Sequence, residues 1–172
     1  MKAALVAAAV CVIASGCGYH LAGRADLLPK TIKTVAVPAF ANSSTTQYKL
    51  TDRLPEAISR ELIARTRYRV VSDPARADAV LKGVVTNYTS FPIVFDSVTG
   101  RAASVELHVT MQVSLVERAT GKVLFNRPAL ETRDRFQIAS LPGQYFEESD
   151  TALNRVSQSA AKQVVSDLLN SF

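Results

Sequence analysis

The chain has 172 residues, a formal net charge of +5, and 48% hydrophobic and 20% charged residues. This length suits one domain with a substantial core, and the near-average composition excludes collagen-like, coiled-coil and disordered chains. No stretch beyond the N-terminus approaches the roughly 20 apolar residues of a membrane-spanning helix, so a polytopic membrane protein is excluded. The basic balance indicates an anionic partner, and the compartment of the protein decides which one.

The N-terminal residues have the layout of a secretory signal peptide. Met1-Lys2 supplies a positive charge, residues 3–14 are almost wholly apolar, and small residues follow. Ala14-Ser15-Gly16-Cys17 resembles the lipobox of bacterial lipoproteins, in which the chain is cut directly before an acylated cysteine. We therefore expect a signal peptide over residues 1–16 and lipidation of Cys17.

A lipidated Cys17 changes how the rest of the chain is interpreted. Cys11 is lost with the signal peptide, and loss of Lys2 lowers the formal net charge to about +4. A protein outside the cytoplasm does not meet DNA, so the expected anionic partners are lipid phosphates, peptidoglycan or lipopolysaccharide rather than nucleic acid. Gly18 is not the aspartate that commonly retains lipoproteins in the inner membrane, which favours the outer membrane. The alternative is an ordinary secreted protein with a free thiol, a liability in an oxidising compartment.

After the signal peptide, the chain predicts a tether followed by a single domain. Residues 17–32 lead away from the expected anchor, and we place the domain at residues 33–172, because no repeat, low-complexity tract or long linker divides it. The domain opens with a β-rich run at residues 34–40, in which Pro38 indicates an edge strand or an early end.

An amphipathic helix is predicted next, from apolar residues that recur every four positions between Leu50 and Leu62. With Asp52 as the N-cap, Pro55 falls in the first turn, where its missing N–H costs nothing. If the helix instead begins near Tyr48, Pro55 should kink it.

The second half of the domain is mainly β-structure. We expect a short strand at residues 68–71 and a longer one at residues 79–90, which Phe91-Pro92 should end. Strict alternation from Val105 to Leu115 predicts a half-buried antiparallel strand. A turn at Ala119–Lys122 then leads into a further strand that runs to Phe136.

A final amphipathic helix completes the domain, with an apolar stripe of Leu153, Val156, Ala160, Val164 and Leu168. The two helices each have an apolar face that can cover the same face of a sheet. The sequence therefore predicts an α+β fold, a two-layer sandwich of two helices on one face of a roughly four-stranded mixed sheet.

The residues offer no catalytic or metal-binding constellation. With Cys17 acylated, no cysteine nucleophile remains, and the sequence lacks HExxH, GxSxG and glycine-rich phosphate-loop motifs. His20 and His108 are isolated in the sequence, and such histidines are usually surface or interface residues. We therefore expect no enzymatic activity, no cofactor and no metal. A periplasmic hydrolase would need a paired acid and base that we do not find.

Several short runs of the sequence carry a resemblance to a known family. They are Cys17–Leu21, Leu28-Pro29, the VAVPAF run at residues 35–40, Arg65–Val71, Ala77–Gly83, Thr99–Ala102 and Thr120–Leu124. No single run is diagnostic, but the ordered set resembles the lipopolysaccharide-assembly lipoprotein family LptE over essentially the whole mature chain. Pro55 departs from the family, most members of which would continue the helix there.

The resemblance implies a sandwich that stands as a plug in the lumen of the outer-membrane β-barrel partner LptD. Together the two proteins insert lipopolysaccharide into the outer leaflet, and the lipoprotein also binds lipopolysaccharide and helps the barrel to assemble. In the family, basic residues around the central hairpin turns are linked to that binding. The matching region here offers Arg101 and Lys122, with Arg133 and Arg135 as further candidates, for which a solvated surface role stays open.

The alternative function is an anchored periplasmic interaction domain of another kind. A peptidoglycan-synthase activator or a secretion-pore subunit also shows an anchor, a V-A-V strand, and an L…I…EL helix that leads to a Y-R-V-V strand. The hairpin from Gly100 to Lys122 and the final helix favour the lipopolysaccharide-transport family.

Overall fold

The computed structural model describes residue 29 and residues 31–43, 49–138 and 145–171. The expected signal peptide, Cys17 and His20 lie outside the described residues. The elements are β1 (Thr34–Ala36), β2 (Ala41–Asn42), α2 (Leu50–Arg65), β3 (Arg69–Val71), the 3-10 helix η1 (Pro74–Arg76), β4 (Ala79–Phe95), β5 (Ala102–Glu117), β6 (Val123–Gln137) and α3 (Tyr145–Asn170).

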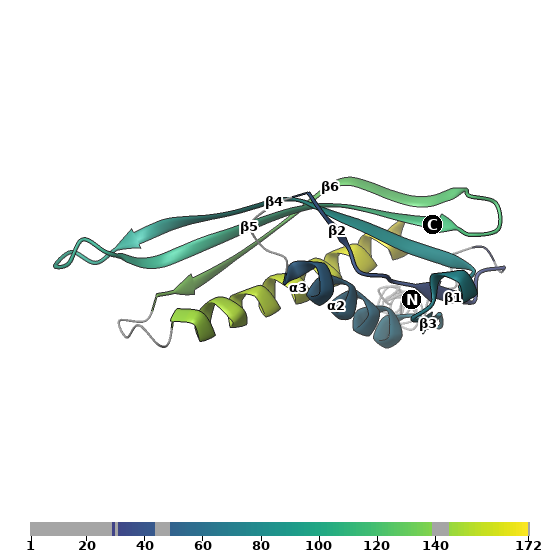
Figure 1. The fold of residues 1–172 in the computed structure, drawn as a ribbon, viewed down its shortest axis with the longest axis horizontal. Helices are drawn as coiled ribbons and strands as arrows, with labels where there is room; N and C mark the ends of the chain where they lie inside the picture. Colours follow the sequence, from purple (N-terminus) through teal and green to yellow (C-terminus); the bar gives the residue numbers. More distant parts are fainter. Residues whose placement is uncertain (1–28, 30, 44–48, 139–144, 172) are drawn as a thin grey trace, which may run out of the picture.

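The strands form one mixed sheet, and both helices lie against the same face of it (Figure 1). The strand order is β3-β1-β4-β5-β6, and β2 pairs separately with β4. β1 is parallel to β3 and β4, whereas β4, β5 and β6 form an antiparallel meander. The predicted α+β arrangement is confirmed. The predicted number of about four strands is wrong, since the described residues form six strands. The expected short strand at residues 68–71 is confirmed by β3, whereas β2 has only two residues, too few to show a periodic pattern.

The core lies between the sheet and the helix layer. β5 buries Val105, Leu107, Val109, Met111, Val113 and Leu115, as their alternation predicts. Both predicted helical stripes are also buried, from Leu50 to Leu62 in α2 and from Leu153 to Leu168 in α3. Each fully buried aliphatic side chain stabilises the fold by about 1.5–3 kcal/mol relative to exposure, so this shared interface holds the two layers together.

β1 and β4 each depart from one expectation drawn from their prolines. β1 ends at Ala36, which confirms the early end indicated by Pro38, but the strand is not at an edge, because it lies between β3 and β4. The expected break at Phe91-Pro92 is wrong, since β4 continues to Phe95 and pairs with β5 as far as Ala102. Beyond Val85, β5 is the only described strand that pairs with β4, so the other edge of β4 is free there. A proline at position 92 is tolerated when its nitrogen faces the free edge, because no hydrogen bond between strands is then lost.

Pro55 lies deeper in α2 than expected. The helix begins at Leu50 with Lys49 as the N-cap, so the expected Asp52 cap is wrong. Pro55 therefore falls in the second turn, where its missing N–H leaves the carbonyl of Thr51 without its usual donor from four residues on. The backbone N–H of Phe40 donates to that carbonyl at 2.9 Å instead. The carbonyl that Pro55 leaves without a partner in the helix therefore binds the segment that follows β1.

The ring of Phe40 covers a glycine of the sheet. Phe40 is buried, and a Cβ built on Gly83 of β4 would overlap three of its ring carbons. Glycine is therefore required at this position by close approach and not by backbone conformation.

We predict that Gly83→Ala lowers the free energy of unfolding by about 1–3 kcal/mol, because the buried ring of Phe40 has to move. Urea unfolding monitored by circular dichroism measures the change. Adding Phe40→Leu to Gly83→Ala should recover part of the loss. An unchanged unfolding midpoint for Gly83→Ala would contradict this packing.

Asp78 ties the start of β1 to the start of β4. Its Oδ2 accepts hydrogen bonds from the backbone N–H groups of Lys33 and Thr34 and from the Thr34 hydroxyl, each at 2.9 Å. These bonds, with a smaller contribution from the charge of Arg118, hold the pKa of the Asp78 carboxyl below its ordinary value. The ionised carboxylate therefore stabilises the folded state.

We predict that Asp78→Asn is less stable than the native chain by about 1 kcal/mol at pH 7, because the charge-assisted part of these bonds is lost. A carboxyl with a lowered folded pKa stabilises the protein above its unfolded pKa of about 4, and that contribution disappears as the pH falls through the folded pKa. The stability difference between the two proteins should therefore shrink below about pH 4 in urea titrations. A constant difference from neutral to acidic pH would contradict the prediction.

Candidate functional site

β4 and β5 form a long hairpin whose end extends beyond both helices (Figure 1). We call residues 91–101 the hairpin tip. Its turn is closed by a hydrogen bond of 2.8 Å from the N–H of Asp96 to the carbonyl of Arg101, and Gly100 adopts a positive φ of 69°. The Asp96 carboxylate accepts hydrogen bonds from the backbone and hydroxyl of Thr99 and from the Val98 N–H, which lower the pKa of this carboxyl. The turn is therefore internally ordered.

The hairpin tip exposes a concentration of apolar side chains. Exposure is 43% for Phe91, 39% for Ile93, 51% for Val94, 59% for Phe95 and 91% for Val98. Among the described residues, Ile63 and Val123 are the other large hydrophobic residues with comparable exposure, and they lie on other elements. Soluble proteins rarely gather large apolar side chains on one exposed segment, so the hairpin tip indicates a contact with a partner.

Arg101 borders this apolar surface. Its side chain is exposed and forms no ion pair with the described residues, because the carboxylate of Asp96 is directed into the turn. The hairpin tip therefore combines large apolar side chains with an available guanidinium group. That combination suits a ligand with both hydrocarbon and anionic groups.

The four basic residues singled out from the sequence do not lie together. Arg101 is in the turn between β4 and β5, whereas Lys122 follows the turn between β5 and β6 at the opposite end of the sheet (Figure 1). β5 has 16 residues, so roughly 50 Å separates these two turns. Arg133 and Arg135 lie in β6, opposite the half of β5 that leads to the hairpin tip.

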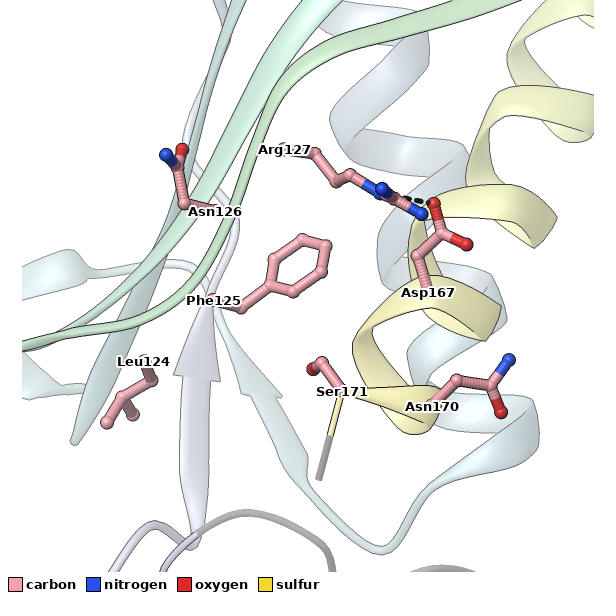
Figure 2. A pocket seen from close by; sticks show the side chains of 7 residues that line it. All are labelled: Leu124, Phe125, Asn126, Arg127, Asp167, Asn170 and Ser171. Atoms are coloured by element: carbon pink, nitrogen blue, oxygen red, sulfur yellow. Dashed lines mark hydrogen bonds and ion pairs between the residues drawn. The ribbon is translucent and has the colours of Figure 1, made fainter.

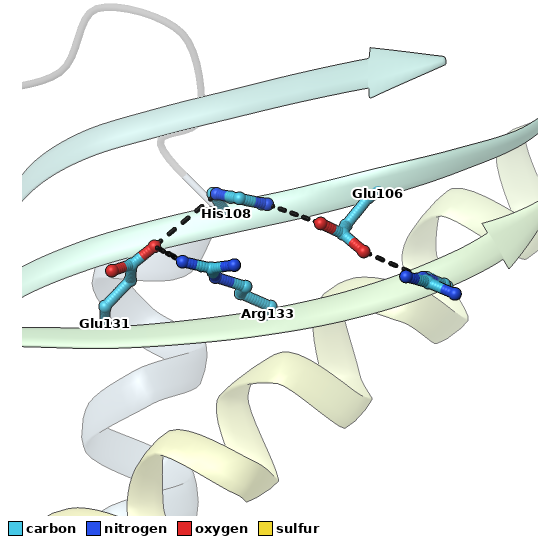
Figure 3. A network of polar contacts seen from close by, with 5 residues as sticks. Glu106, His108, Glu131 and Arg133 are labelled. Atoms are coloured by element: carbon cyan, nitrogen blue, oxygen red, sulfur yellow. Dashed lines mark hydrogen bonds and ion pairs between the residues drawn. The ribbon is translucent and has the colours of Figure 1, made fainter. Parts of the chain in front are cut away.

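Arg133 and Arg135 belong to a charged network on the sheet face that the helices leave open (Figure 3). Arg135 Nε donates to Glu106 at 2.7 Å, and Arg133 forms an ion pair with Glu131 at 2.9 Å. His108 lies between the two carboxylates, 2.7 Å from Glu106 through Nε2 and 3.5 Å from Glu131 through Nδ1. Hydrogen bonds from His108 and Arg135 hold the pKa of the Glu106 carboxyl below its ordinary value.

This network makes its two arginines less available to an anionic ligand. A phosphate that approached Arg133 or Arg135 would compete with a carboxylate already bound to the guanidinium group, whereas Arg101 has no such competitor among the described residues. The ring of Phe91 packs edge-on against His108, with ring centroids 4.9 Å apart, and so joins the network to the hairpin tip. Sequence reasoning misses the apolar surface, because Phe91-Pro92 resembles a strand break and gives no sign that neighbouring apolar side chains are exposed.

A cleft of about 340 Å³ lies between the start of β6 and the end of α3 (Figure 2). Phe125 forms part of its wall, and Arg127 Nε donates to Asp167 at 2.9 Å across it. This ion pair raises the pKa of Arg127. Because the two charged groups of the cleft neutralise each other, its lining provides no acid and base poised for catalysis.

No helix in the described part of the chain is long and apolar enough to cross a membrane. Within residues 31–43, 49–138 and 150–171, no three His, Cys, Asp or Glu side chains gather in a way that could hold a metal ion.

The sequence matches the family described as "LptE: Lipopolysaccharide-assembly" over residues 32–168, well over half of the chain. No protein with curated annotation matches it.

Several solved structures share the fold. Rare lipoprotein B from Shewanella oneidensis is 15% identical with a TM-score of 0.53, and the match covers 79% of this chain and 95% of that chain. Protein XCC0632 from Xanthomonas campestris is 12% identical with a TM-score of 0.55, covering 87% and 91%. The PelC dodecamer from Paraburkholderia phytofirmans is 20% identical with a TM-score of 0.53, covering 81% and 90%. At these identities the likeness shows the fold alone. The family match, and not the structural likeness, therefore favours lipopolysaccharide assembly over another kind of anchored interaction domain.

Proposed function

The chain belongs to the LptE lipopolysaccharide-assembly family, and we propose that it is an outer-membrane lipoprotein that plugs the LptD β-barrel and assists lipopolysaccharide assembly at the cell surface. The observation that carries this proposal is the exposed apolar hairpin tip, bordered by Arg101, in a chain of this family. Lipopolysaccharide combines acyl chains with phosphates, which are the two chemistries that this surface accommodates.

The hairpin tip would bind lipopolysaccharide through two kinds of contact. Phe91, Phe95 and Val98 can bury part of their exposed apolar surface against acyl chains, at about 25 cal/mol per Å² removed from water. Arg101 can donate charge-assisted hydrogen bonds to a lipid A phosphate in a bidentate geometry. Lys122, Arg133 and Arg135 are retained as candidate contacts of lower rank, because the first is remote and the other two already have carboxylate partners.

The open face of the sheet supports a role as a plug. On β5 it carries Glu106, His108, Thr110, Gln112 and Ser114, which alternate with the buried side chains. The lumen of an outer-membrane barrel is polar, so a domain with this hydrophilic face is suited to stand inside one. LptD is accordingly the proposed protein partner.

The N-terminal anchor and the absence of catalysis complete the proposal. Residues 1–16 would be a cleaved signal peptide, residues 17–32 a tether acylated at Cys17, and residues 33–172 the single domain, held on the periplasmic side of the outer membrane. The role is one of binding, without enzymatic activity, cofactor, metal or nucleic-acid partner.

Purification from outer membranes separates this function from the alternative. Recovery of the chain with a large β-barrel supports the plug, whereas a ring of identical subunits without the barrel supports a secretion-pore subunit. Depletion of the protein should also reduce the amount of lipopolysaccharide that reaches the cell surface, and normal surface levels would contradict the role.

We predict that Arg101→Glu weakens lipopolysaccharide binding at least tenfold, which corresponds to about 1.4 kcal/mol, because the phosphate contact becomes repulsive. Phe95→Ser should weaken binding as well, by removing apolar contact. Both side chains are exposed, so the free energy of unfolding should change by less than about 1 kcal/mol. Binding is measured with fluorescent lipopolysaccharide.

The matched control is Lys162→Glu, the same change of charge at an exposed site on α3. It should leave lipopolysaccharide binding unchanged. If Arg101→Glu and Lys162→Glu behave alike, the hairpin tip is not the binding site.

We predict that Cys17→Ala abolishes acylation and signal cleavage at this position, because the thiol that receives the lipid is absent. Metabolic labelling with a fatty acid measures the change, and Cys11→Ala is the control that should label normally. Normal labelling of Cys17→Ala would refute the proposed anchor.

A further inference from the structure

The end of the sheet opposite the hairpin tip is lined by basic side chains. We call this set the basic rim, and it consists of Lys33, Arg69, Arg76, Arg118 and Lys122, all of them exposed. The residues come from the starts of β1 and β3, from η1, from the end of β5 and from the turn before β6.

Backbone hydrogen bonds hold these segments side by side. The N–H of Arg69 donates to the carbonyl of Lys33 at 2.9 Å, and the N–H of Lys33 donates to the carboxylate of Asp78 at 2.9 Å. The N–H of Arg118 donates to the carbonyl of Asp78 at 2.8 Å. Lys122 closes the turn that follows, since its carbonyl accepts the N–H of Glu117 at 2.8 Å. These bonds bring the backbone segments of four of the five cations together at one end of the sheet, and Arg76 lies in η1, two residues before Asp78.

The charges of the basic rim are available for a partner. Arg118 donates through Nε to the carbonyl of Ala77 at 2.7 Å and lies near the carboxylate of Asp78. The other four cations form no ion pair with the described residues. The same region carries three carboxylates. Asp78 accepts three hydrogen bonds, Asp73 accepts one from the Ala75 N–H, and Glu117 accepts one from Thr120. The five cations therefore exceed the local anions by two.

We propose that the basic rim docks on an anionic phospholipid surface and so holds the domain upright on the membrane that anchors it. This inference rests on the proposed lipidation of Cys17. The chain enters the domain at this end, where the Ile32 N–H donates to the Pro29 carbonyl at 2.8 Å directly before Lys33. The segment from Cys17 to Pro29 spans at most about 40 Å when fully extended. A tether of this length allows the basic rim to reach the bilayer, and the hairpin tip lies roughly 50 Å further along the sheet.

The distribution of charge in the basic rim suits a layer of lipid headgroups better than a single rigid ligand. The cations come from several strand ends and turns rather than from one loop. Mobile headgroups can adjust to such a distribution, and each Lys or Arg near an anionic leaflet strengthens association about fivefold.

The test uses the full, lipidated chain in vesicles of phosphatidylcholine with or without phosphatidylglycerol. A fluorophore is attached at Ala119→Cys, in the turn of the basic rim, or at Ser97→Cys, in the hairpin tip, and energy transfer to a headgroup-labelled lipid is measured. We expect at least twofold more transfer from position 119 when phosphatidylglycerol is present, and loss of this gain at high salt. Transfer from position 97 should not increase.

Matched variants assign the effect to the basic rim. Lys33→Gln, Arg69→Gln and Arg76→Gln combined should abolish the gain at position 119. The control neutralises the same number and types of cation on the helix layer, by Arg60→Gln, Arg155→Gln and Lys162→Gln, and should retain the gain.

The outcomes separate this inference from the proposed function. A chain that does not float with vesicles of either composition lacks the anchor, which overturns both. An anchored chain with equal transfer in the two compositions overturns the docking of the basic rim alone. Loss of the gain in the control variant would show an effect of net charge and would also overturn it.

Discussion

The pairing of β4 with β5 sets the dimensions on which the other features depend. The two strands are bonded from Ala79 opposite Glu117 to Phe95 opposite Ala102, and they extend beyond the helix layer at one end (Figure 1). Helices cover the part of the sheet that carries the buried face of β5. The projecting part has no such cover, so its apolar side chains stay exposed. At the other end of the hairpin, β4 pairs with β1, which brings the N-terminal side of the domain there.

Three surfaces with different chemistry result from this geometry. The hairpin tip offers apolar side chains and Arg101, and the open sheet face carries matched charges. The basic rim has an excess of cations, four of which form no ion pair with the described residues. A surface of paired charges has little net charge and is compatible with a polar protein surface, whereas unpaired cations attract an anionic surface. The arrangement is consistent with a domain that contacts a lipid headgroup layer at one end, a polar wall along its sheet, and an amphipathic ligand at the other end.

Local rules are broken where tertiary contacts compensate for them. A proline in the second turn of α2 removes an internal hydrogen bond, and the N–H of Phe40 satisfies the carbonyl of Thr51 that this leaves. The anchored Phe40 ring then covers Gly83, a residue with low strand propensity. The proline, the phenylalanine and the glycine are therefore one packing unit that joins α2, the segment after β1 and β4.

The sequence by itself determined the elements whose signal is periodic and local. The stripes of α2 and α3 and the alternation of β5 mark one buried face each, because helix and strand periods are properties of the backbone. The resemblance to the family was likewise visible in short ordered runs. Only the tertiary structure decided that β4 continues through Pro92. A proline is tolerated in a strand that has a free edge, and whether the edge is free depends on which strands, distant in the sequence, pair with it. It also decided that Arg135 of β6 meets Glu106 of β5, while Arg101 and Lys122 lie far apart. Strand direction and register set these relations, and neither is a local property of the chain.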